Sequence, residues 1–263
     1  SMAENEEVVF TTSTGPVRVI TAASLFDGHD AAINVMRRLI QSSGAEVIHL
    51  GHDQSAKAVV DCAIQEDAHA VALTSYQGGH VEYFTYIRQL LDEAGCEHVR
   101  IFGGGGGTIT PPEIRTLHQS GISKIYSPDD GRTMGLMGMI HHLMGLASEV
   151  DLDGKNRMKS LDGPISPDDM AKVGLLLTLS ESADEKAFKS AVEACRSSDK
   201  DVPVIGFTGT GGAGKSSLLD ELMLRIQRDN PGKKVCLLCV DPTRKRTGGA
   251  LLGDRIRMNS LSN

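Results

Sequence analysis

The sequence of 263 residues has no long apolar segment, and its first residues lack the basic and then apolar pattern of a signal peptide. These absences argue against a membrane-spanning protein and against a secreted one. Positive charge is not in excess either, since the formal net charge is -7. Nucleic acids and anionic membrane surfaces attract a positive field. We therefore expect a cytoplasmic protein with no nucleic-acid partner and no membrane partner.

Cysteine is also scarce, with five residues that are scattered along the chain. An odd and scattered set is not a disulfide framework, and it favours a reducing compartment. Cys236 and Cys239 have the spacing of a CxxC pair, but they lie inside the apolar run 235–240. Because free cysteines are usually buried, we interpret this pair as two thiols of a buried strand.

Short apolar runs are present, and from residue 17 onward they alternate with amphipathic stretches of helical periodicity. This alternation is typical of a parallel sheet with crossover helices. The predicted strands are 17–21, 46–50, 70–73, 99–102 and 124–126. The predicted helices lie near 30–43, 55–66, 81–95, 111–120 and 131–147. Five such units predict an α/β fold with a flavodoxin-like, Rossmann-type five-stranded parallel sheet.

Composition divides the chain into four segments. Residues 1–16 have no periodic apolar pattern, so we expect a tag and a disordered N-terminus there. The α/β domain spans 17–147. The polar stretch 148–200 predicts a linker that contains a pair of helices, because residues 166–169 form a good N-terminal cap and residues 184–195 have helical spacing. Residues 201–263 begin a second strand-loop-helix unit.

In parallel α/β sheets, ligands bind beyond the carboxyl ends of the strands, and unusual polar residues occur at that edge here. Asp27 and His29 follow the first predicted strand, and Thr74 and Ser75 follow the third. A carboxylate that orients an imidazole is a common arrangement behind a metal-bound histidine. An isolated pair of this kind is nevertheless more often a simple loop hydrogen bond.

Five consecutive glycines, residues 103–107, follow the fourth predicted strand. Such a run costs conformational entropy on folding, and a close approach of the backbone to a ligand readily explains it. A flexible surface loop is the alternative. Because the run directly follows a buried strand, we predict that Gly103, Gly104 and Gly105 line a ligand site.

Together these loops resemble the cobalamin-binding domain of the adenosylcobalamin-dependent acyl-CoA mutases, the methylmalonyl-CoA and isobutyryl-CoA mutase group. The family pattern Asp-x-His-x-x-Gly occurs at 27–32, with Ala32 in place of glycine. The pattern Ser-x-Leu occurs at 74–76, with Tyr76 in place of leucine, and Gly-Gly lies within 103–107. The resemblance implies adenosylcobalamin as cofactor, with His29 on cobalt and Asp27 behind it. It also implies a slot for the displaced nucleotide tail, lined by Ser75 and the glycine run.

A phosphate-binding motif lies near the end of the sequence. Residues 204–208 read as a buried strand, residues 209–216 fit GxxxxGK[ST], and a helix is predicted over 218–228. In this motif, backbone N–H groups surround phosphate oxygens, Lys215 neutralises their charge and Ser216 reaches Mg²⁺. The predicted nucleotide-binding residues are Gly211, Gly212, Ala213, Gly214, Lys215, Ser216 and Ser217.

The residues after this motif run from Asp-Pro at 241–242 through Thr-Gly-Gly to Leu-Gly-Asp at 252–254. This stretch resembles the metallochaperone GTPases that serve the acyl-CoA mutases. The resemblance implies GTP or GDP with Mg²⁺ as ligands, and Asp241 as a Mg²⁺ group. A strand-end turn at Asp241 is an equally open interpretation.

A cobalamin domain followed by a GTPase unit resembles the fused isobutyryl-CoA mutases. This implies an isomerase that interconverts isobutyryl-CoA and n-butyryl-CoA by a radical rearrangement, with GTPase activity and a homodimer in the full-length protein. The sequence contains no barrel for acyl-CoA and no Asn-Lys-x-Asp for guanine. We therefore expect a piece of a larger enzyme that holds no catalytic residue of the rearrangement and is inactive as a mutase alone.

Two rival functions are compatible with the same residues. The chain is alternatively a non-enzymatic cobalamin sensor or carrier coupled to a nucleotide switch. A flavodoxin-like domain that binds another cofactor, such as a flavin, at the same edge is the second rival. That second function predicts that binding is indifferent to His29.

Overall fold

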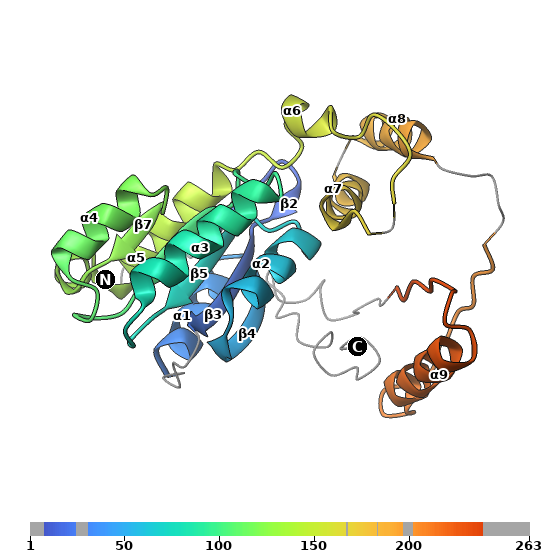
Figure 1. Ribbon diagram of the computed structural model, residues 1–263, viewed down its shortest axis with the longest axis horizontal. Coiled ribbons are helices and arrows are strands. Elements are labelled where there is room, and N and C mark those ends of the chain that lie inside the picture. Colours follow the sequence, from blue (N-terminus) through green and yellow to red (C-terminus); the bar gives the residue numbers. More distant parts are fainter. Residues whose placement is uncertain (1–7, 25–30, 167, 183, 197–201, 239–263) are drawn as a thin grey trace, which may run out of the picture.

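The computed structural model describes residues 8–24, 31–166, 168–182, 184–196 and 202–238. Its centre is a five-stranded, fully parallel sheet with the strand order β4-β3-β5-β6-β7 (Figure 1). The strands are β3 (Arg18–Ser24), β4 (Glu46–Gln54), β5 (Ala70–Thr74), β6 (Arg100–Gly104) and β7 (Lys124–Tyr126). Counted within this sheet, the order is 2-1-3-4-5, which is that of flavodoxin. The predicted fold class is confirmed.

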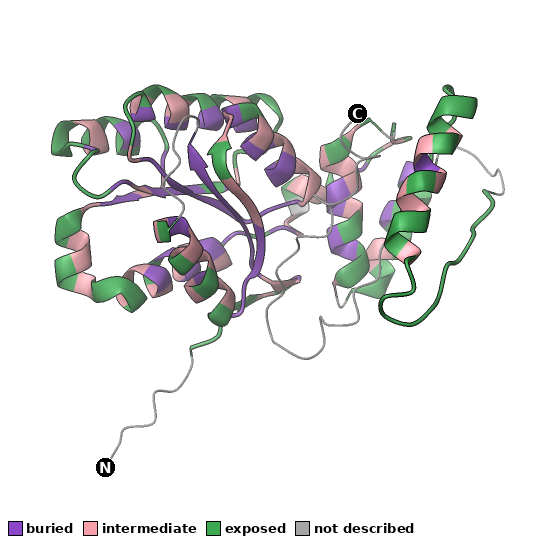
Figure 2. Ribbon diagram, turned by 90° about the horizontal axis from the view of Figure 1, so that it is seen from below, coloured by how far each residue is buried: buried purple, intermediate pink, exposed green. Residues whose placement is uncertain are grey.

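Helices cover both faces of the sheet, so the central strands are buried on both sides (Figure 2). One face packs against α2 (Ala56–Gln65), α3 (His80–Glu93) and α4 (Pro111–Gln119). The other face packs against α1 (Ala31–Ser42) and α5 (Pro128–Ser148). Neighbouring residues of β3 alternate between the two cores, with Ile20 in the first and Val19 in the second. This alternation explains why the strands read as continuous apolar runs.

Local sequence signals set the starts of several helices. Ser55 caps α2 by accepting a hydrogen bond from the backbone N–H of Ala58. Ser127 and Asp130 form a capping box at the start of α5, with Pro128 at its first position. Inside α5, Gly135 has φ 68° and ψ 172°, which interrupts the helix. A backbone of this kind is accessible to glycine and strained for other residues.

The segment before the sheet is part of the fold, which corrects the expectation of disorder up to residue 16. β1 (Thr11–Thr12) and β2 (Gly15–Pro16) form a small antiparallel hairpin. The Phe10 side chain packs against the core on the α5 face, and the Phe10 N–H donates to the carbonyl of Ser43 at 3.0 Å. One aromatic anchor leaves no periodic pattern, so the sequence did not reveal this contact.

The stretch predicted as a linker with helices contains α6 (Lys155–Met158), α7 (Met170–Glu181) and α8 (Glu185–Cys195). Asp169 caps α7, in agreement with the capping signal predicted at 166–169, and Asp184 caps α8 over the stretch predicted as a helix. The helices α7 and α8 share a third small core of buried side chains. Its members are Leu161, Leu175, Leu179, Ala191 and Cys195.

Two predicted strands near the end of the sequence are wrong for the residues described. Residues 204–208 and 235–238 have no strand structure, and Val204 and Leu238 are 93% and 80% exposed. Cys236 is exposed as well, so it is not a buried thiol. The physical reason is pairing: a strand needs a hydrogen-bonded neighbour, and no described segment pairs with either stretch. The helix between them, α9 (Lys215–Asp229), agrees with the predicted helix.

Candidate cofactor and nucleotide sites

A cavity of about 490 Å³ lies at the carboxyl edge of the sheet, where parallel α/β folds bind ligands. The carboxyl ends of β5, β6 and β7 contribute Thr74, Gly104 and Tyr126 to its lining. Its side walls are apolar and come from helices, with Met36 on α1 and Met139 on α5 among them. Its volume and its apolar lining are those of a small-molecule site that accepts a largely apolar group.

Thr74 gives this cavity a polar atom that points to a ligand. The residue ends β5 and is 7% exposed, and its Oγ1 is buried with no hydrogen-bond partner among the described residues. An unsatisfied buried hydroxyl costs about 1 to 3 kcal/mol. A ligand atom that hydrogen-bonds to Oγ1 would remove that cost on binding.

Ser75, predicted to line the slot for the nucleotide tail, is not among the residues that line this cavity. The side chain is 1% exposed, and its Oγ accepts a hydrogen bond from the Ser24 hydroxyl at 3.1 Å. The Ser75 N–H donates to the carbonyl of Gly104 at 2.9 Å. Ser75 therefore joins the ends of β3, β5 and β6 at the edge where the cavity opens.

Two features of the structure explain the glycine run: close packing within the protein and the cavity that the run lines. A Cβ on Gly103 would clash with the Phe84 ring and come within 2.8 Å of Ile125, and a Cβ on Gly105 would clash with the carbonyl of Ser75. These two glycines are therefore required by packing within the protein, which corrects the idea that a ligand alone explains the run. A Cβ on Gly104 would lie 3.7 Å from the carbonyl oxygen of Tyr126, which is an ordinary contact, so packing does not require glycine there. Gly104 lines the cavity together with Gly103 and Gly105.

Both departures from the family pattern also line the cavity. Ala32 lies on α1, and Tyr76 follows the end of β5. The Tyr76 ring lies 3.5 Å from the position of a Cβ on Gly106, which has a left-handed φ of 57°. The ring of Tyr76, larger than leucine, thus lies beside a glycine in the cavity lining. The wall residues of α1 and α5 were missed as site residues, because their helical spacing reads as ordinary core.

The predicted cobalt ligand His29 and its partner Asp27 lie outside the described residues. The residues on either side are described: Ser24 ends β3, and Ala31 begins α1. Ser24 contacts Ser75 at the carboxyl edge of the sheet, beside the cavity. Asp241, predicted to bind Mg²⁺, also lies outside the described residues.

A contact between a histidine and a carboxylate, missed by sequence reasoning, joins the segments after β5 and β6. His80 Nε2 at the start of α3 lies 3.0 Å from Glu113 Oε2 at the start of α4. The Thr110 N–H also donates to this Glu113 oxygen, at 2.8 Å. Mainly because of that backbone hydrogen bond, then because of the Thr110 hydroxyl and His80, the pKa of Glu113 is lowered to about 2. The carboxylate is thus charged at neutral pH and caps the start of α4, with the His80 ring of α3 beside it.

The phosphate-binding motif forms one loop before α9. Gly212 and Gly214 have left-handed φ angles of 76° and 81°, which favour glycine. Lys215 Nζ donates to the carbonyls of Gly209 and Thr210 at 2.7 and 2.8 Å. The predicted residues from Gly211 to Ser217 therefore lie together at a helix N-terminus, where backbone N–H groups and the helix dipole favour an anion.

Two family models match the chain: "B12 binding domain" over residues 17–127 and "Methylmalonyl Co-A mutase-associated GTPase MeaB" over residues 173–263. The 2-hydroxyisobutanoyl-CoA mutase small subunit of Aquincola tertiaricarbonis is 34% identical over 115 residues, which are 43% of this chain and 82% of that relative. The chain belongs to the B12-dependent acyl-CoA mutase family. The second match begins inside α7, within the segment that the sequence predicted as a linker.

Fused members of the family are more similar still. The fused isobutyryl-CoA mutase of Geobacillus kaustophilus (strain HTA426) is 51% identical over 253 residues, 94% of this chain and 23% of that relative. That of Nocardia farcinica (strain IFM 10152) is 53% identical over 247 residues, with the same two shares. The chain thus spans about a quarter of the length of these relatives. The predicted order of a cobalamin domain followed by the start of a GTPase domain is confirmed.

Proposed function

We propose that this chain is the cofactor-binding and partial GTPase-chaperone portion of an adenosylcobalamin-dependent mutase that interconverts isobutyryl-CoA and n-butyryl-CoA. The observation that carries the proposal is the apolar cavity at the carboxyl edge, with the buried and unpaired hydroxyl of Thr74 in its wall. Its location in a B12-binding domain and the adjoining phosphate-binding loop support the same function. When bound, adenosylcobalamin supplies the radical chemistry of the rearrangement.

The residues of this domain hold and orient the cofactor. His29 is the proposed ligand of cobalt, and Asp27 would accept the hydrogen bond of the other imidazole nitrogen, which fixes the tautomer. The apolar cavity suits the benzimidazole base of the displaced nucleotide tail, and Thr74 offers it one hydrogen bond. Ser75, Gly103, Gly104 and Gly105 shape that cavity through the contacts described above.

The phosphate-binding loop is the proposed site for GTP or GDP. The residues from Gly211 to Ser217 would surround the phosphates, with Lys215 beside their negative charge. Ser216 and Asp241 are the proposed Mg²⁺ groups. Acyl-CoA and a second copy in a homodimer are proposed partners of the full-length enzyme only.

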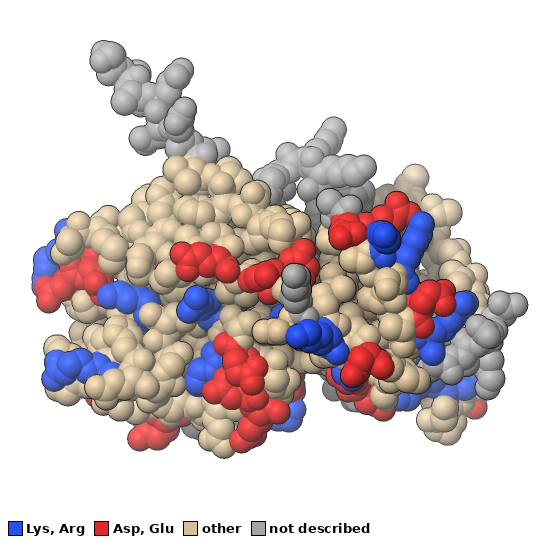
Figure 3. Space-filling view, turned by 90° about the horizontal axis from the view of Figure 1, so that it is seen from above, with Lys and Arg blue, Asp and Glu red and all other residues tan. Residues whose placement is uncertain are grey.

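Charge and hydropathy fit a cytoplasmic enzyme without membrane or nucleic-acid partners, as proposed. On the face in Figure 3, acidic and basic side chains are intermixed, whereas nucleic acid requires a continuous positive field. Of the helices in the described ranges, none is long and apolar enough to cross a bilayer.

The decisive experiment locates the nitrogen on cobalt. We would load the chain with cobalamin whose benzimidazole nitrogens are isotopically labelled, reduce it to cob(II)alamin and record the EPR spectrum. We expect splitting from an unlabelled nitrogen, lost in His29→Ala and retained in His52→Ala, a control at an exposed histidine. Splitting from the labelled nitrogen in every variant would refute the assignment of His29 and favour a sensor or carrier that keeps the cofactor's own base.

A further inference from the structure

Buried polar side chains gather around Asp67 at the amino ends of β3 and β5, opposite the cofactor cavity. Asp67 is 5% exposed and has a left-handed φ of 47°. Its Oδ1 lies 2.5 Å from Arg157 Nη2, and its Oδ2 accepts a hydrogen bond from the Thr178 hydroxyl at 2.6 Å. Arg18 donates to the Thr178 oxygen at 2.7 Å and to the backbone carbonyl of Asp67 at 3.0 Å. We call these four residues the Asp67 cluster.

The cluster joins three separate parts of the chain. Arg18 begins β3 and Asp67 precedes β5, so both belong to the cobalamin domain. Arg157 lies on α6, and Thr178 lies on α7. The contacts of Asp67 with these two helices therefore connect residues 90 and 111 positions apart.

The helix α7 fits closely against the cobalamin domain at one point. Gly174 lies one turn before Thr178, and a Cβ there would come within 3.1 Å of the Ile64 carbonyl and 3.3 Å of Asp67 Cβ. A glycine at this position lets the α7 backbone approach the end of α2. The close fit and the buried hydrogen bonds lie on the same side of the helix, since positions four apart share a face.

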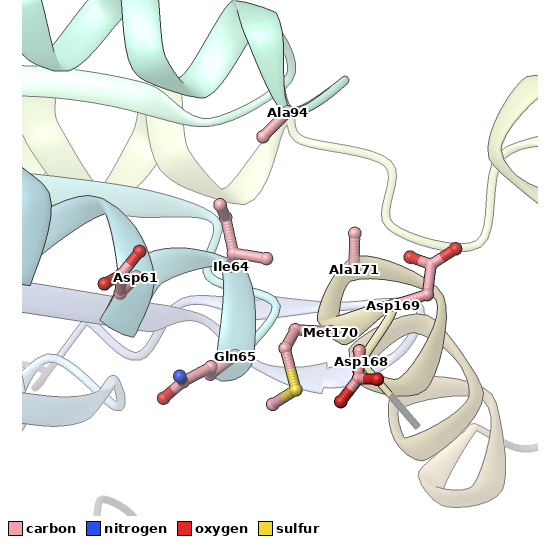
Figure 4. A pocket seen from close by; sticks show the side chains of 8 residues that line it. All are labelled: Asp61, Ile64, Gln65, Ala94, Asp168, Asp169, Met170 and Ala171. Carbon is pink, nitrogen blue, oxygen red and sulfur yellow. The ribbon is translucent and has the colours of Figure 1, made fainter. Parts of the chain in front are cut away.

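The start of α7 is more loosely packed. A cavity of about 260 Å³ separates Met170 and Ala171 from Ile64 and Gln65 (Figure 4). Three carboxylates border it, and each one has a lysine partner: Asp61 with Lys57, Asp168 with Lys234 and Asp169 with Lys172. Ala171 reaches the core of the domain, and the closest polar and backbone contacts of α7 with the domain are at Gly174 and Thr178.

We infer that the Asp67 cluster is a fixed joint that holds the first helix of the GTPase portion on the cobalamin domain. The GTPase family match begins at residue 173, so both Gly174 and Thr178 belong to that portion. A buried ion pair requires one geometry, and in some proteins it selects one arrangement more than it adds stability. The cluster then sets where the nucleotide-binding segment begins relative to the cofactor edge. This inference goes beyond the proposed function, because it concerns how the two portions are joined.

The substitution Asp67→Asn tests the joint. Asparagine tolerates the left-handed backbone at least as readily as aspartate, so the variant removes the charge without adding strain. It leaves two guanidinium groups without their buried counter-ion. We expect amide hydrogen exchange in α7 to accelerate at least tenfold, while exchange in α3 changes less than twofold.

A second variant guards against a general loss of folding. Thr178→Val removes only the hydroxyl and leaves Arg18 and Arg157 beside Asp67. Thr85→Val is the matched control, because the Thr85 hydroxyl donates to the backbone of its own helix, α3. We expect faster exchange in α7 for Thr178→Val and unchanged exchange in α7 for Thr85→Val. Unchanged α7 protection in both cluster variants, or equal losses in α3 and α7, would overturn the inference. Neither readout depends on cobalamin, so failure of the proposed function leaves this test intact.

Discussion

The hydroxyl of Thr74 shows how one residue can exchange stability for binding. Its oxygen is buried without a partner in a wall of the cavity, and threonine and valine have nearly the same shape. We expect Thr74→Val to raise the free energy of unfolding by about 1 kcal/mol, because an unsatisfied polar group is removed. We expect cobalamin affinity to fall about threefold to tenfold, the value of one hydrogen bond. Urea unfolding and a cobalamin titration measure the two effects.

The two results must be read together. A gain in stability with unchanged cobalamin affinity would mean that the Thr74 hydroxyl forms no hydrogen bond with cobalamin. Thr116→Val is a suitable control, since the Thr116 hydroxyl is exposed and donates to a backbone carbonyl of α4. That variant should leave cobalamin affinity unchanged.

At the same scale, sequence reasoning found residue types more reliably than their roles. Glycines at 103 and 105 were predicted because a ligand would approach the backbone there. The structure shows that a Cβ at these positions would also clash with the Phe84 ring and with the Ser75 carbonyl. Residues such as Phe84 lie on other elements, so only the packed fold reveals the contact. Asp67 is a similar case, because its partners Arg157 and Thr178 come from distant helices.

At the scale of elements, periodicity predicted the parallel sheet well because each strand has hydrogen-bonded neighbours. The strand predicted at 17–21 extends to Ser24, and the one predicted at 46–50 extends to Gln54. Their last residues are less apolar, yet pairing between β3 and β4 continues to Ser24 and Gln54, with register shifts after Thr21 and after Ala22. The run 204–208 is as apolar as these strands, but it has no described neighbour to pair with. Apolar pattern indicates that a segment can be a strand, and pairing decides whether it is one.

The interruption of α5 provides a prediction at this scale. Gly135 has a positive φ inside the helix, whereas Gly145 lies in its regular part, with 3.9 Å between a Cβ and the Phe10 ring. We expect Gly135→Ala to lower the free energy of unfolding by about 1 kcal/mol or more, because alanine is strained there. We expect Gly145→Ala to be neutral or to raise it by up to about 1 kcal/mol. Thermal unfolding of both variants measures this difference in sign.

The interruption of α5 at Gly135 also affects the walls of the cavity. Residues on both sides of the interruption line it, with Pro128 before and Met139 after Gly135. A regular helix through position 135 would change the relative orientation of these two parts. If Gly135→Ala and Gly145→Ala had equal stability, the interruption would be incidental to the fold.

At the scale of the whole molecule, the cobalamin domain is attached to α6 and α7 through buried polar contacts as well as through the chain itself. Arg18 begins β3 and His69 directly precedes β5, and these two central strands end at the cofactor edge with Ser24 and Thr74. The joint and the cavity are therefore at opposite ends of the same two strands. Strand continuity alone does not establish energetic coupling.

His69 makes the stability of the whole molecule depend on pH. Its Nδ1 accepts a hydrogen bond from the Arg18 N–H at 2.9 Å, so protonation of Nδ1 would break that bond. Burial first, and then Arg18, lowers the pKa of His69 from 6.5 to about 3. The pKa of His98 is likewise lowered to about 4, chiefly by burial. Between pH 6.5 and these values the unfolded chain binds more protons than the folded one, so acid destabilises the fold.

The variant His69→Asn isolates this effect, because the asparagine Oδ1 can accept the Arg18 hydrogen bond without titrating. From the His69 shift, we expect the wild-type chain to lose on the order of 2 kcal/mol more unfolding free energy than this variant between about pH 7 and about pH 4.5. Urea unfolding at the two pH values measures the difference, with His52→Asn as an exposed control that retains the wild-type loss. Equal losses in wild type and His69→Asn would place the acid sensitivity elsewhere. His69 accepts a hydrogen bond from Arg18 of the Asp67 cluster, so a confirmed difference would place an acid-sensitive group directly beside the joint.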